Sequence, residues 1–524
     1  MSEALQIAGT VAACALAASA LLLSRPRMRL LAVSGALALA VALVVGQAWD
    51  GPLADVRESA PRLALVLVLG VALVGGLVAC FVRWPLAMPL VAIAALPFRI
   101  PVDAGGESSN LLLPLYAVIV AAVLAGLVDA TRSRTRPGVA PRGALPVPRL
   151  LALALAAALL LYGLQAIYSS DVEFAARNAG FFLVPFAALF VLLAGVEWTP
   201  RLLAGGLAAA AFSALLFAAI GIGQHLTGTI FWNDSFSASN DFHFYFRVNS
   251  LFWDPNIYGR YLALVLVLLL AALLWTREQR RALALTAAIA VIWLGLLFAF
   301  SQSSFIALLV GVAVLAGLRW SWRRSLIVSV GAALAIAGAV YAFAGVSDSA
   351  TTARDAAADL TEGRTTLVKG GLDLFGDRPV QGYGSASFSD AFGEAEGIAE
   401  GKTTISHNEP VTVAAEQGVL GVAVYLALIA ASLWTLLAGM RSIAPGLGAP
   451  AEAIGDRARS AAGAAGLARI AILAAFCALL VHTIGYAGYL TDPLTWALLA
   501  VGGALALPAL GGAAPASVRA GADA

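Results

Sequence analysis

The sequence predicts an all-α, polytopic membrane protein with about fifteen transmembrane helices. Its 524 residues are 61% hydrophobic and only 12% charged, whereas soluble domains are about half apolar and about a quarter charged. The mean hydropathy is +0.90. A helix needs about 20 apolar residues to cross a bilayer, and the chain has many such stretches. This excludes a soluble enzyme, and the net charge of +2 does not suggest nucleic-acid binding.

Apolar runs long enough to span a bilayer recur along the whole chain. The first run has no basic segment before it and no cleavage site after it, so we expect it to remain in the mature protein. Two long polar segments interrupt the later runs, and the second is expected to contain short helices near residues 349–361 and 365–374. We expect spans near residues 6–23, 30–48, 61–82, 84–98, 110–129, 149–168, 180–195, 202–222, 257–275, 282–299, 303–318, 325–345, 410–436, 468–486 and 492–508.

Alternate connections between these spans differ strongly in charge. One set, which begins with residues 24–29 and ends with the C-terminal tail, holds 21 arginines and 6 acidic residues. The other set holds 11 basic and 24 acidic residues. Basic connections tend to stay in the cytoplasm. We therefore expect the polar segments 223–256 and 346–409 outside the cytoplasm and the C-terminus inside it.

The first candidate block runs from Arg247 to Asn256, just before the ninth span. Asp254 is a possible N-cap and Pro255 fits the first turn of the helix that follows. Arg247 would then lie at the membrane surface, where the alternative interpretation is an arginine that only reaches lipid headgroups. Arg260 lies one turn inside the span, and a buried guanidinium needs a partner.

The second block lies in the long outer segment and begins with Gly363-Arg364. Lys369 and Arg378 follow, and then the turn Gly382–Gly384. Glycine-rich turns beside basic side chains can bind phosphate through backbone N–H groups and guanidinium forks. A charged surface helix in the loop explains these residues equally well.

The third block is Ser406-His407-Asn408-Glu409-Pro410, followed by Glu416 and Gly418. Ser406 and Glu409 fit a capping box, which places His407 at the outer start of the thirteenth span. The helix dipole there disfavours imidazolium, so His407 can accept a proton; alternatively it only caps the loop. Glu416 lies two turns inside the span, where we expect it to hold an arginine or the helix packing.

The remaining histidines and the cysteines give no indication of a metal site. His225, His243 and His482 lack the spacing of a helical zinc site, and no Asp-x-Asp motif is present. The three cysteines lie in apolar stretches without ligand spacing. We expect no metal and no other cofactor.

In this order and on this topology, the blocks resemble the O-antigen ligase and O-antigen polymerase superfamily, the membrane glycosyltransferases of the WaaL and Wzy type. The most specific block is His407-Asn408 followed by Glu416-x-Gly418-x-x-Gly421. One departure is Ser304, where many members have an arginine. The other landmarks are Leu96-Pro97-Phe98, Tyr168–Asn178, Arg247–Asn256, Ala299–Ser304, Gly363-Arg364 and Asp377–Gly384.

The resemblance extends over residues 84–508 and divides the chain into five parts. These are an N-terminal addition of three spans (1–83), the first part of the membrane core with the outer loop 223–256 (84–345), the large outer loop (346–409), the last spans (410–508) and a flexible tail (509–524).

The resemblance implies a GT-C type fold at the bacterial cytoplasmic membrane, with the catalytic loops outside. It implies inverting transfer of a glycan from an undecaprenyl-diphosphate-linked donor to a hydroxyl of a lipid, glycan or protein. Arginines matching Arg247 and Arg364 would hold the diphosphate, and a histidine matching His407 would be the base. By position, Arg260, Lys369 and Arg378 are further candidates for the diphosphate site, and Asn256, Asn408, Glu416 and Gly418 are supporting residues.

The chemistry of these residues agrees with that function. Sugar nucleotides are cytosolic, so an outward-facing enzyme needs a donor carried on a lipid. Fixed guanidinium groups can stabilise a diphosphate leaving group without a metal, and a hydroxyl acceptor needs a base within reach. The sequence does not separate a ligase from a polymerase. The alternative is a flippase or another transporter, which would place ionisable residues around a midplane cavity, whereas here they lie near the outer ends of spans.

Overall fold

The computed structural model describes residues 1–49, 59–104, 107–132, 147–231, 236–237, 240, 246–343, 365–397, 406–444 and 461–510. Among these residues, twelve helical segments are long and apolar enough to cross a membrane. The chain is a multi-pass membrane protein, and the predicted fold class is confirmed. The segments are formed by α1 (Glu3–Leu22), α2 (Pro26–Ala48), α4 (Ala60–Arg83), α6 (Leu113–Thr131), α7 (Arg149–Gln165), α8 (Val172–Asn178) with η2 (Ala179–Leu183) and α9 (Val184–Ala194), α10 (Pro200–Thr227), α12 (Pro255–Trp275), α13 (Gln279–Ala299), α14 (Gln302–Arg319), α18 (Glu409–Leu437) and α20 (Ala461–Gly485).

The other three predicted spans also contain helices. α15 (Trp322–Phe343) has 22 residues and α21 (Pro493–Ala506) has 14. α5 (Ala87–Ala95) has only nine residues, which at 1.5 Å per residue is about 14 Å against a hydrocarbon core of about 30 Å. The span predicted at 84–98 is therefore wrong as a complete crossing. Pro85 and Pro97 bracket the helix, and proline ends or interrupts helices.

A two-stranded antiparallel hairpin follows α5, which the sequence analysis did not predict. β1 (Ile100–Ala104) pairs with β2 (Glu107–Leu111), with Ile100 opposite Leu111. Such a hairpin is marginally stable alone, and here it joins α5 to α6. It is the exception to the otherwise helical structure of the described residues.

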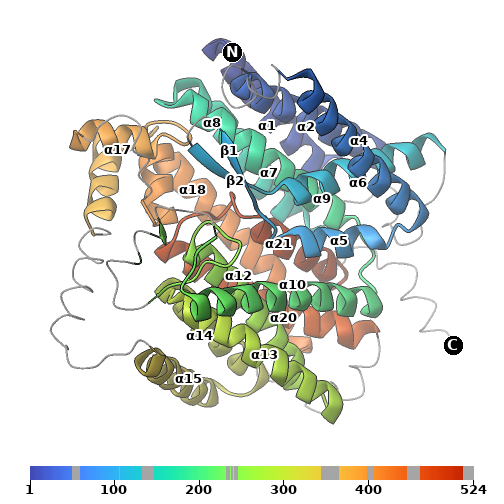
Figure 1. Ribbon diagram of the computed structural model, residues 1–524, viewed down its shortest axis with the longest axis vertical. Coiled ribbons are helices and arrows are strands. Elements are labelled where there is room, and N and C mark those ends of the chain that lie inside the picture. Colours follow the sequence, from blue (N-terminus) through green and yellow to red (C-terminus); the bar gives the residue numbers. More distant parts are fainter. Residues whose placement is uncertain are drawn as a thin grey trace.

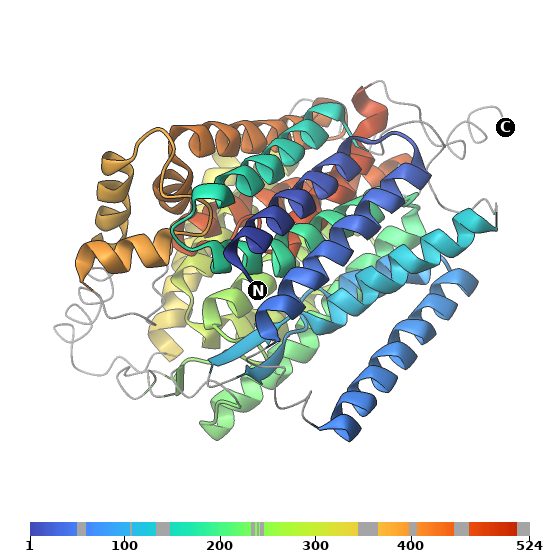
Figure 2. The same ribbon diagram turned by 90° about the horizontal axis from the view of Figure 1, so that it is seen from above.

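The long helices pack into one bundle and run across the view in Figure 1. α1 packs against α2 and α7, and α20 packs against α12 and α14. Small residues allow close approach between helices: a Cβ on Gly311 of α14 would lie 2.3 Å from a methyl carbon of Val267 in α12. α4 contacts α6 at the edge of the bundle, and only 6% of its apolar window is buried (Figure 2). Thus α1 and α2 of the N-terminal part are integrated in the bundle, whereas α4 is peripheral.

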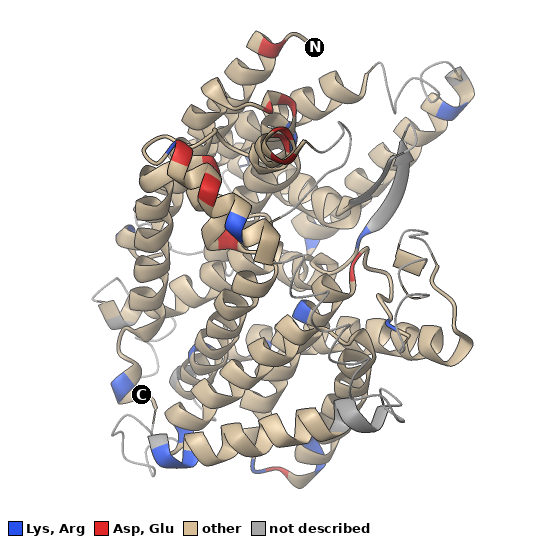
Figure 3. Cartoon of the chain, turned by 90° about the vertical axis from the view of Figure 1, so that its left-hand side faces the viewer, with Lys and Arg blue, Asp and Glu red and all other residues tan. Residues whose placement is uncertain are grey.

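One end of the bundle carries most of the candidate residues, and we call it the site end. It comprises segments 166–171, 246–254, 378–388, 406–409 and 486–492, which hydrogen bonds tie to one another and to the ends of the helices. Figure 3 looks onto this end and shows several acidic positions on it. At the opposite end, basic side chains cap helices: Arg27 Nη2 donates to the Ala130 carbonyl at 3.1 Å, and Arg469 donates to the Ala438 carbonyl.

Candidate active site

The start of α12 follows the sequence prediction. Asp254 is the N-cap, and its Oδ1 accepts a hydrogen bond from the Asn256 backbone N–H at 2.6 Å. Arg247 is fixed upstream of this cap. Its backbone N–H and carbonyl bond the side chain of Asn240 at 3.1 and 3.0 Å, and its Nε donates to the Ala299 carbonyl at 3.2 Å. Arg247 is therefore held at the C-terminal end of α13.

The start of α18 differs from the predicted capping box. Asn408 is the N-cap, and its Oδ1 accepts from the Val411 N–H at 3.0 Å. Asparagine caps helices as well as serine does, so the cap lies two residues later than predicted. Glu409 therefore does not complete a capping box. Its Oε2 instead accepts a hydrogen bond from the Gly488 N–H at 2.7 Å. Asn408 Nδ2 also donates to the Ile484 carbonyl at 2.9 Å, so both residues fasten α18 to the end of α20.

His407 occupies a turn with an unusual backbone conformation. Its φ is +54°, a region that non-glycine residues rarely adopt and that clusters at functional sites. The buried Ser406 holds the turn, because its Oγ accepts from the Asn408 N–H at 3.1 Å and also bonds Thr412. The imidazole lies against Tyr486, with 5.3 Å between ring centroids. The turn therefore presents His407 to the segment 486–492.

Arg260 is buried, with 3% of its surface exposed, and the partner that the sequence analysis required is Asp492. Its Nη1 donates to Asp492 Oδ2 at 2.7 Å and to the Gly488 carbonyl at 3.0 Å. A guanidinium has five N–H donors, and all five are used inside the protein. The remaining three bonds are Nη2 to the carbonyls of Tyr486 (2.6 Å) and Ala487 (3.1 Å) and Nε to His482 Nδ1 (3.0 Å).

His482 connects Arg260 to the start of α14. Because Nδ1 accepts from Arg260, Nε2 carries the proton, and it lies 3.1 Å from Ser304 Oγ. Ser301 Oγ lies 2.8 Å from Ser304 Oγ and donates to Asn256 Oδ1 at 2.8 Å. Asn256 and Ser304 thus belong to one buried polar network. The sequence analysis considered His482 only as a metal ligand, although a histidine in an apolar run needs a partner.

Glu416 anchors the outer loop rather than an arginine. Its two carboxylate oxygens accept from the N–H groups of Ala386 (2.9 Å) and Phe388 (3.2 Å), where α17 (Phe388–Glu396) begins. Beside it, Gly418 interrupts the helical geometry of α18 with φ +63°, and a Cβ there would lie 2.4 Å from the Val380 carbonyl oxygen. Only glycine permits this crossing of the two backbones.

The cations of the outer loop are more peripheral. A helix spans 365–377, as predicted, and Lys369 is exposed on it. Arg378 is exposed as well, with its guanidinium carbon 4.2 Å from the centroid of the Tyr383 ring. Arg364, His243 and the helix expected at 349–361 lie outside the described residues, so the geometry of the predicted Arg247–Arg364 pair is not part of the site described here.

Tyr486 and Arg99 are not among the candidate site residues that the sequence predicted. Burial raises the pKa of the Tyr486 phenol, and the nearby Asp254 raises it further, so the phenol stays protonated. Arg99 follows α5, and burial lowers its pKa, while Asp492 and Tyr116 act in the opposite direction. Tyr486 and Arg260 also lie within electrostatic range of Arg99. Arg99 therefore lies at the site end, although no motif pointed to it.

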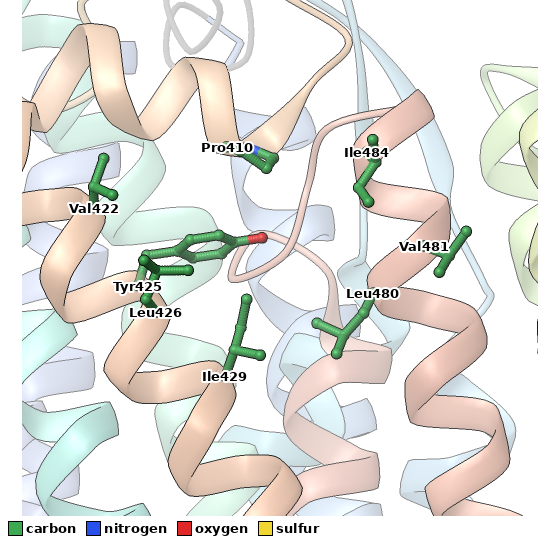
Figure 4. A pocket seen from close by; sticks show the side chains of 8 residues that line it. All are labelled: Pro410, Val422, Tyr425, Leu426, Ile429, Leu480, Val481 and Ile484. Atoms are coloured by element: carbon green, nitrogen blue, oxygen red, sulfur yellow. The ribbon is translucent and has the colours of Figure 1, made fainter.

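An apolar groove opens between α18 and α20 (Figure 4), and Pro410, three residues after His407, lines it. It holds about 220 Å³, and Pro410 and Ile484, which line it, adjoin the Asn408 bond that joins the two helices. The remaining lining residues are Val422, Tyr425, Leu426, Ile429, Leu480 and Val481.

Within the described part of the chain, no group of three or more His, Cys, Asp or Glu side chains is arranged to hold a metal ion. The carboxylates of the site end are engaged in other ways. Asp254 caps α12, Glu409 binds the Gly488 N–H, and Asp492 binds Arg260.

Comparison with known families gives one match. Residues 287–426 match the family model for O-antigen ligase, which confirms the predicted resemblance over that segment. It contains α14, the outer loop and the block from His407 to Gly418, but it excludes Arg247, Asn256 and Arg260. No curated protein matches the chain at a significant level.

Proposed function

We propose that the protein transfers a glycan from a polyprenyl-diphosphate-linked donor to an acceptor hydroxyl, with the site end on the outer face of the bacterial cytoplasmic membrane and the C-terminus in the cytoplasm. The match to O-antigen ligase supports a membrane glycan ligase or a related polymerase. Basic side chains at the opposite end of the bundle, such as Arg27 and Arg469, support the orientation.

The proposed reaction is a single displacement at the anomeric carbon of the donor sugar. The acceptor oxygen forms the new C–O bond while the bond to the diphosphate breaks, and the electron pair leaves with the polyprenyl diphosphate. The acceptor proton passes to His407. Arg247 and Arg364 are proposed to stabilise the leaving group, since fixed cations act strongly where water is excluded. Arg260 is proposed to position segment 486–492, because its five donors are already occupied.

The observation that carries this proposal is the turn at His407. A histidine at φ +54° is retained against backbone strain by Ser406 and Asn408, inside the segment that matches the ligase family. The turn also faces Tyr486, on the loop that Arg260 and Asp492 hold in place.

The groove between α18 and α20 supports a lipid-linked substrate. Its lining is apolar, it lies between two membrane-spanning helices, and Pro410 at its upper end is three residues from His407. We assign it to the part of the isoprenoid chain next to the diphosphate. A chain bound there would bring the sugar–phosphate bond to the site end.

The test is a transfer assay with purified full-length protein in liposomes. The donor is a polyprenyl-diphosphate-linked oligosaccharide, and the acceptors are supplied separately as a lipid and as the same donor glycan. We expect acceptor-bound glycan and released polyprenyl diphosphate in equal amounts. Arg177→Gln is the control, because its side chain is 40% exposed and its ion pair is with Glu173, one helical turn away on α8.

Transfer to the lipid acceptor would identify a ligase, and extension of the donor glycan would identify a polymerase. Movement of the intact donor between leaflets without any diphosphate release would contradict the proposal and favour the flippase.

A further inference from the structure

Arg99 is a cation at the site end whose hydrogen-bonding capacity the protein does not use. Its Nε is enclosed and meets no acceptor. Across the described part of the chain, its guanidinium forms no hydrogen bond or ion pair. A guanidinium stays charged and offers five donors, so enclosing the Arg99 Nε without an acceptor is costly. Buried polar groups left unpaired in a folded protein call for an explanation such as a missing ligand.

The carboxylate with the largest electrostatic effect on Arg99 is already occupied. Asp492 is the first of the charges that stabilise the cationic form of Arg99, yet its Oδ2 binds Arg260 at 2.7 Å and its Oδ1 caps α21 through the Leu494 N–H at 2.9 Å. Arg260 has all its donors used, whereas no described acceptor meets Arg99 Nε, although Asp492 acts electrostatically on both arginines. The structure thus completes one arginine site and leaves the other open.

The backbone around Arg99 is anchored, so the side chain is held in place. The preceding residue, Phe98, packs edge-on against Phe217 of α10, with centroids 5.0 Å apart. Phe217 in turn packs against Phe252, at 5.1 Å, in the segment that also carries Arg247. This ring contact links the end of α5 to the start of α12.

The location also matches the proposed reaction. Arg99 lies within electrostatic range of Tyr486, and Tyr486 lies against His407. An anion bound at Arg99 would therefore lie at the same end of the bundle as the proposed base. We propose that Arg99 binds a phosphate oxygen of the lipid-linked donor and is a donor-binding residue in addition to Arg247 and Arg364; this rests on the proposed function.

The first experiment measures binding without turnover. Full-length protein in nanodiscs of zwitterionic lipid is titrated with farnesyl diphosphate, farnesyl monophosphate and inorganic pyrophosphate. We expect Arg99→Gln to weaken farnesyl diphosphate binding at least about tenfold, since a charge-assisted hydrogen bond is lost. Arg99→Lys should recover only part of it, and Arg177→Gln should stay within about twofold of wild type.

The titrations also identify the anion source. Pyrophosphate binding as tight as that of farnesyl diphosphate would indicate a free-anion site and overturn the assignment to a lipid-linked donor. Loss of farnesyl diphosphate binding when anionic phospholipid is added to the nanodiscs would indicate a headgroup site and overturn it as well.

Thermal unfolding without ligand separates a binding role from a structural one. An arginine that awaits a ligand costs stability in the empty protein, so Arg99→Gln should keep or raise the Tm and should lose the Tm increase that farnesyl diphosphate gives to wild type. A clear fall in the Tm of the empty variant, or an unchanged Kd, would overturn the inference.

The two proposals fail in different ways. Wild-type transfer with an unchanged donor KM in Arg99→Gln would remove Arg99 from the donor site and leave the proposed function intact. Arg99-dependent binding of farnesyl diphosphate by a protein that releases no polyprenyl diphosphate would remove the function and leave the site.

Discussion

Replacing Asp492 with Asn tests whether the Arg260 network holds the site together. The two side chains are 3% and 5% exposed, and Nη1 lies 2.7 Å from Oδ2. Asn is nearly isosteric and keeps an oxygen that can cap the Leu494 N–H, so the main change is loss of the negative charge beside Arg260.

The expected loss of stability follows from burial. Removing one partner of a buried ion pair costs about 3–5 kcal/mol, because the other charge is left uncompensated. Arg260 keeps three carbonyl acceptors and His482, which favours the lower limit of about 3 kcal/mol. The matched control is the Arg177–Glu173 pair, which has a similar distance of 2.9 Å but side chains that are 40% and 59% exposed. Arg177→Gln should cost less than about 1 kcal/mol.

The assay is equilibrium unfolding in mixed micelles, followed by tryptophan fluorescence, together with the transfer rate of the folded variant. Asp492→Asn should unfold at lower denaturant and transfer more slowly, because segment 486–492 loses its ion pair with α12. An unfolding midpoint equal to that of the Arg177→Gln control would show that the buried Arg260–Asp492 pair does not stabilise the fold.

Four further predictions concern the same end of the molecule. His407→Gln should lower transfer at least about 100-fold with donor binding retained, and the acidic limb of the wild-type pH–rate profile should be absent from its residual rate; near wild-type transfer would make the base assignment wrong. Gly418→Ala should cost about 1–3 kcal/mol of stability, measured by unfolding, whereas Gly393→Ala, where a Cβ meets open space, should not; equal effects would contradict the backbone-crossing argument. Ile429→Trp should raise KM about tenfold for a long-chain donor, because the larger side chain would displace about two methylene groups of the lipid from the groove, at a cost of about 1.6 kcal/mol. The KM for a short-chain donor should stay unchanged. Equal effects on the two donors would exclude the groove as the lipid site. Transfer should persist in chelator, because the diphosphate charge is assigned to arginines, and loss that magnesium or manganese restores would show a missed metal site.

Local signals in the sequence predicted much of the fold. Asp254 and Pro255 marked the start of α12, and a helix was expected at 365–374 from composition, where the structure has one at 365–377, because caps and helix propensity act within a few residues. The same kind of signal misplaced the start of α18, where Ser406 and Asn408 are both good caps. Tertiary contacts decided between them: the Asn408 amide also reaches the carbonyl of Ile484, 76 residues further along.

The short α5 and the hairpin could not be predicted in the same way. An apolar run of the length of 84–98 fits either a span or a buried short helix, and hydropathy alone does not separate the two. The network of Asn256, Ser304 and His482 was hidden for a different reason. Its hydrogen bonds join residues 45 and 178 positions apart in sequence, and each residue alone is an ordinary polar residue in an apolar stretch.

Arg260 and Arg99 show what the sequence alone does not predict about a buried cation. Arg260 was a candidate ligand because it lies inside a span, and the requirement for a partner was correct. The requirement does not say whether the partner is protein or substrate, since that depends on which carbonyls point toward Arg260 from a loop 226 to 228 residues away. For Arg260 the loop supplies every acceptor. For Arg99 Nε the described residues supply no acceptor. Because of this difference, the expected anion contact moves from Arg260 in α12 to Arg99, which follows α5.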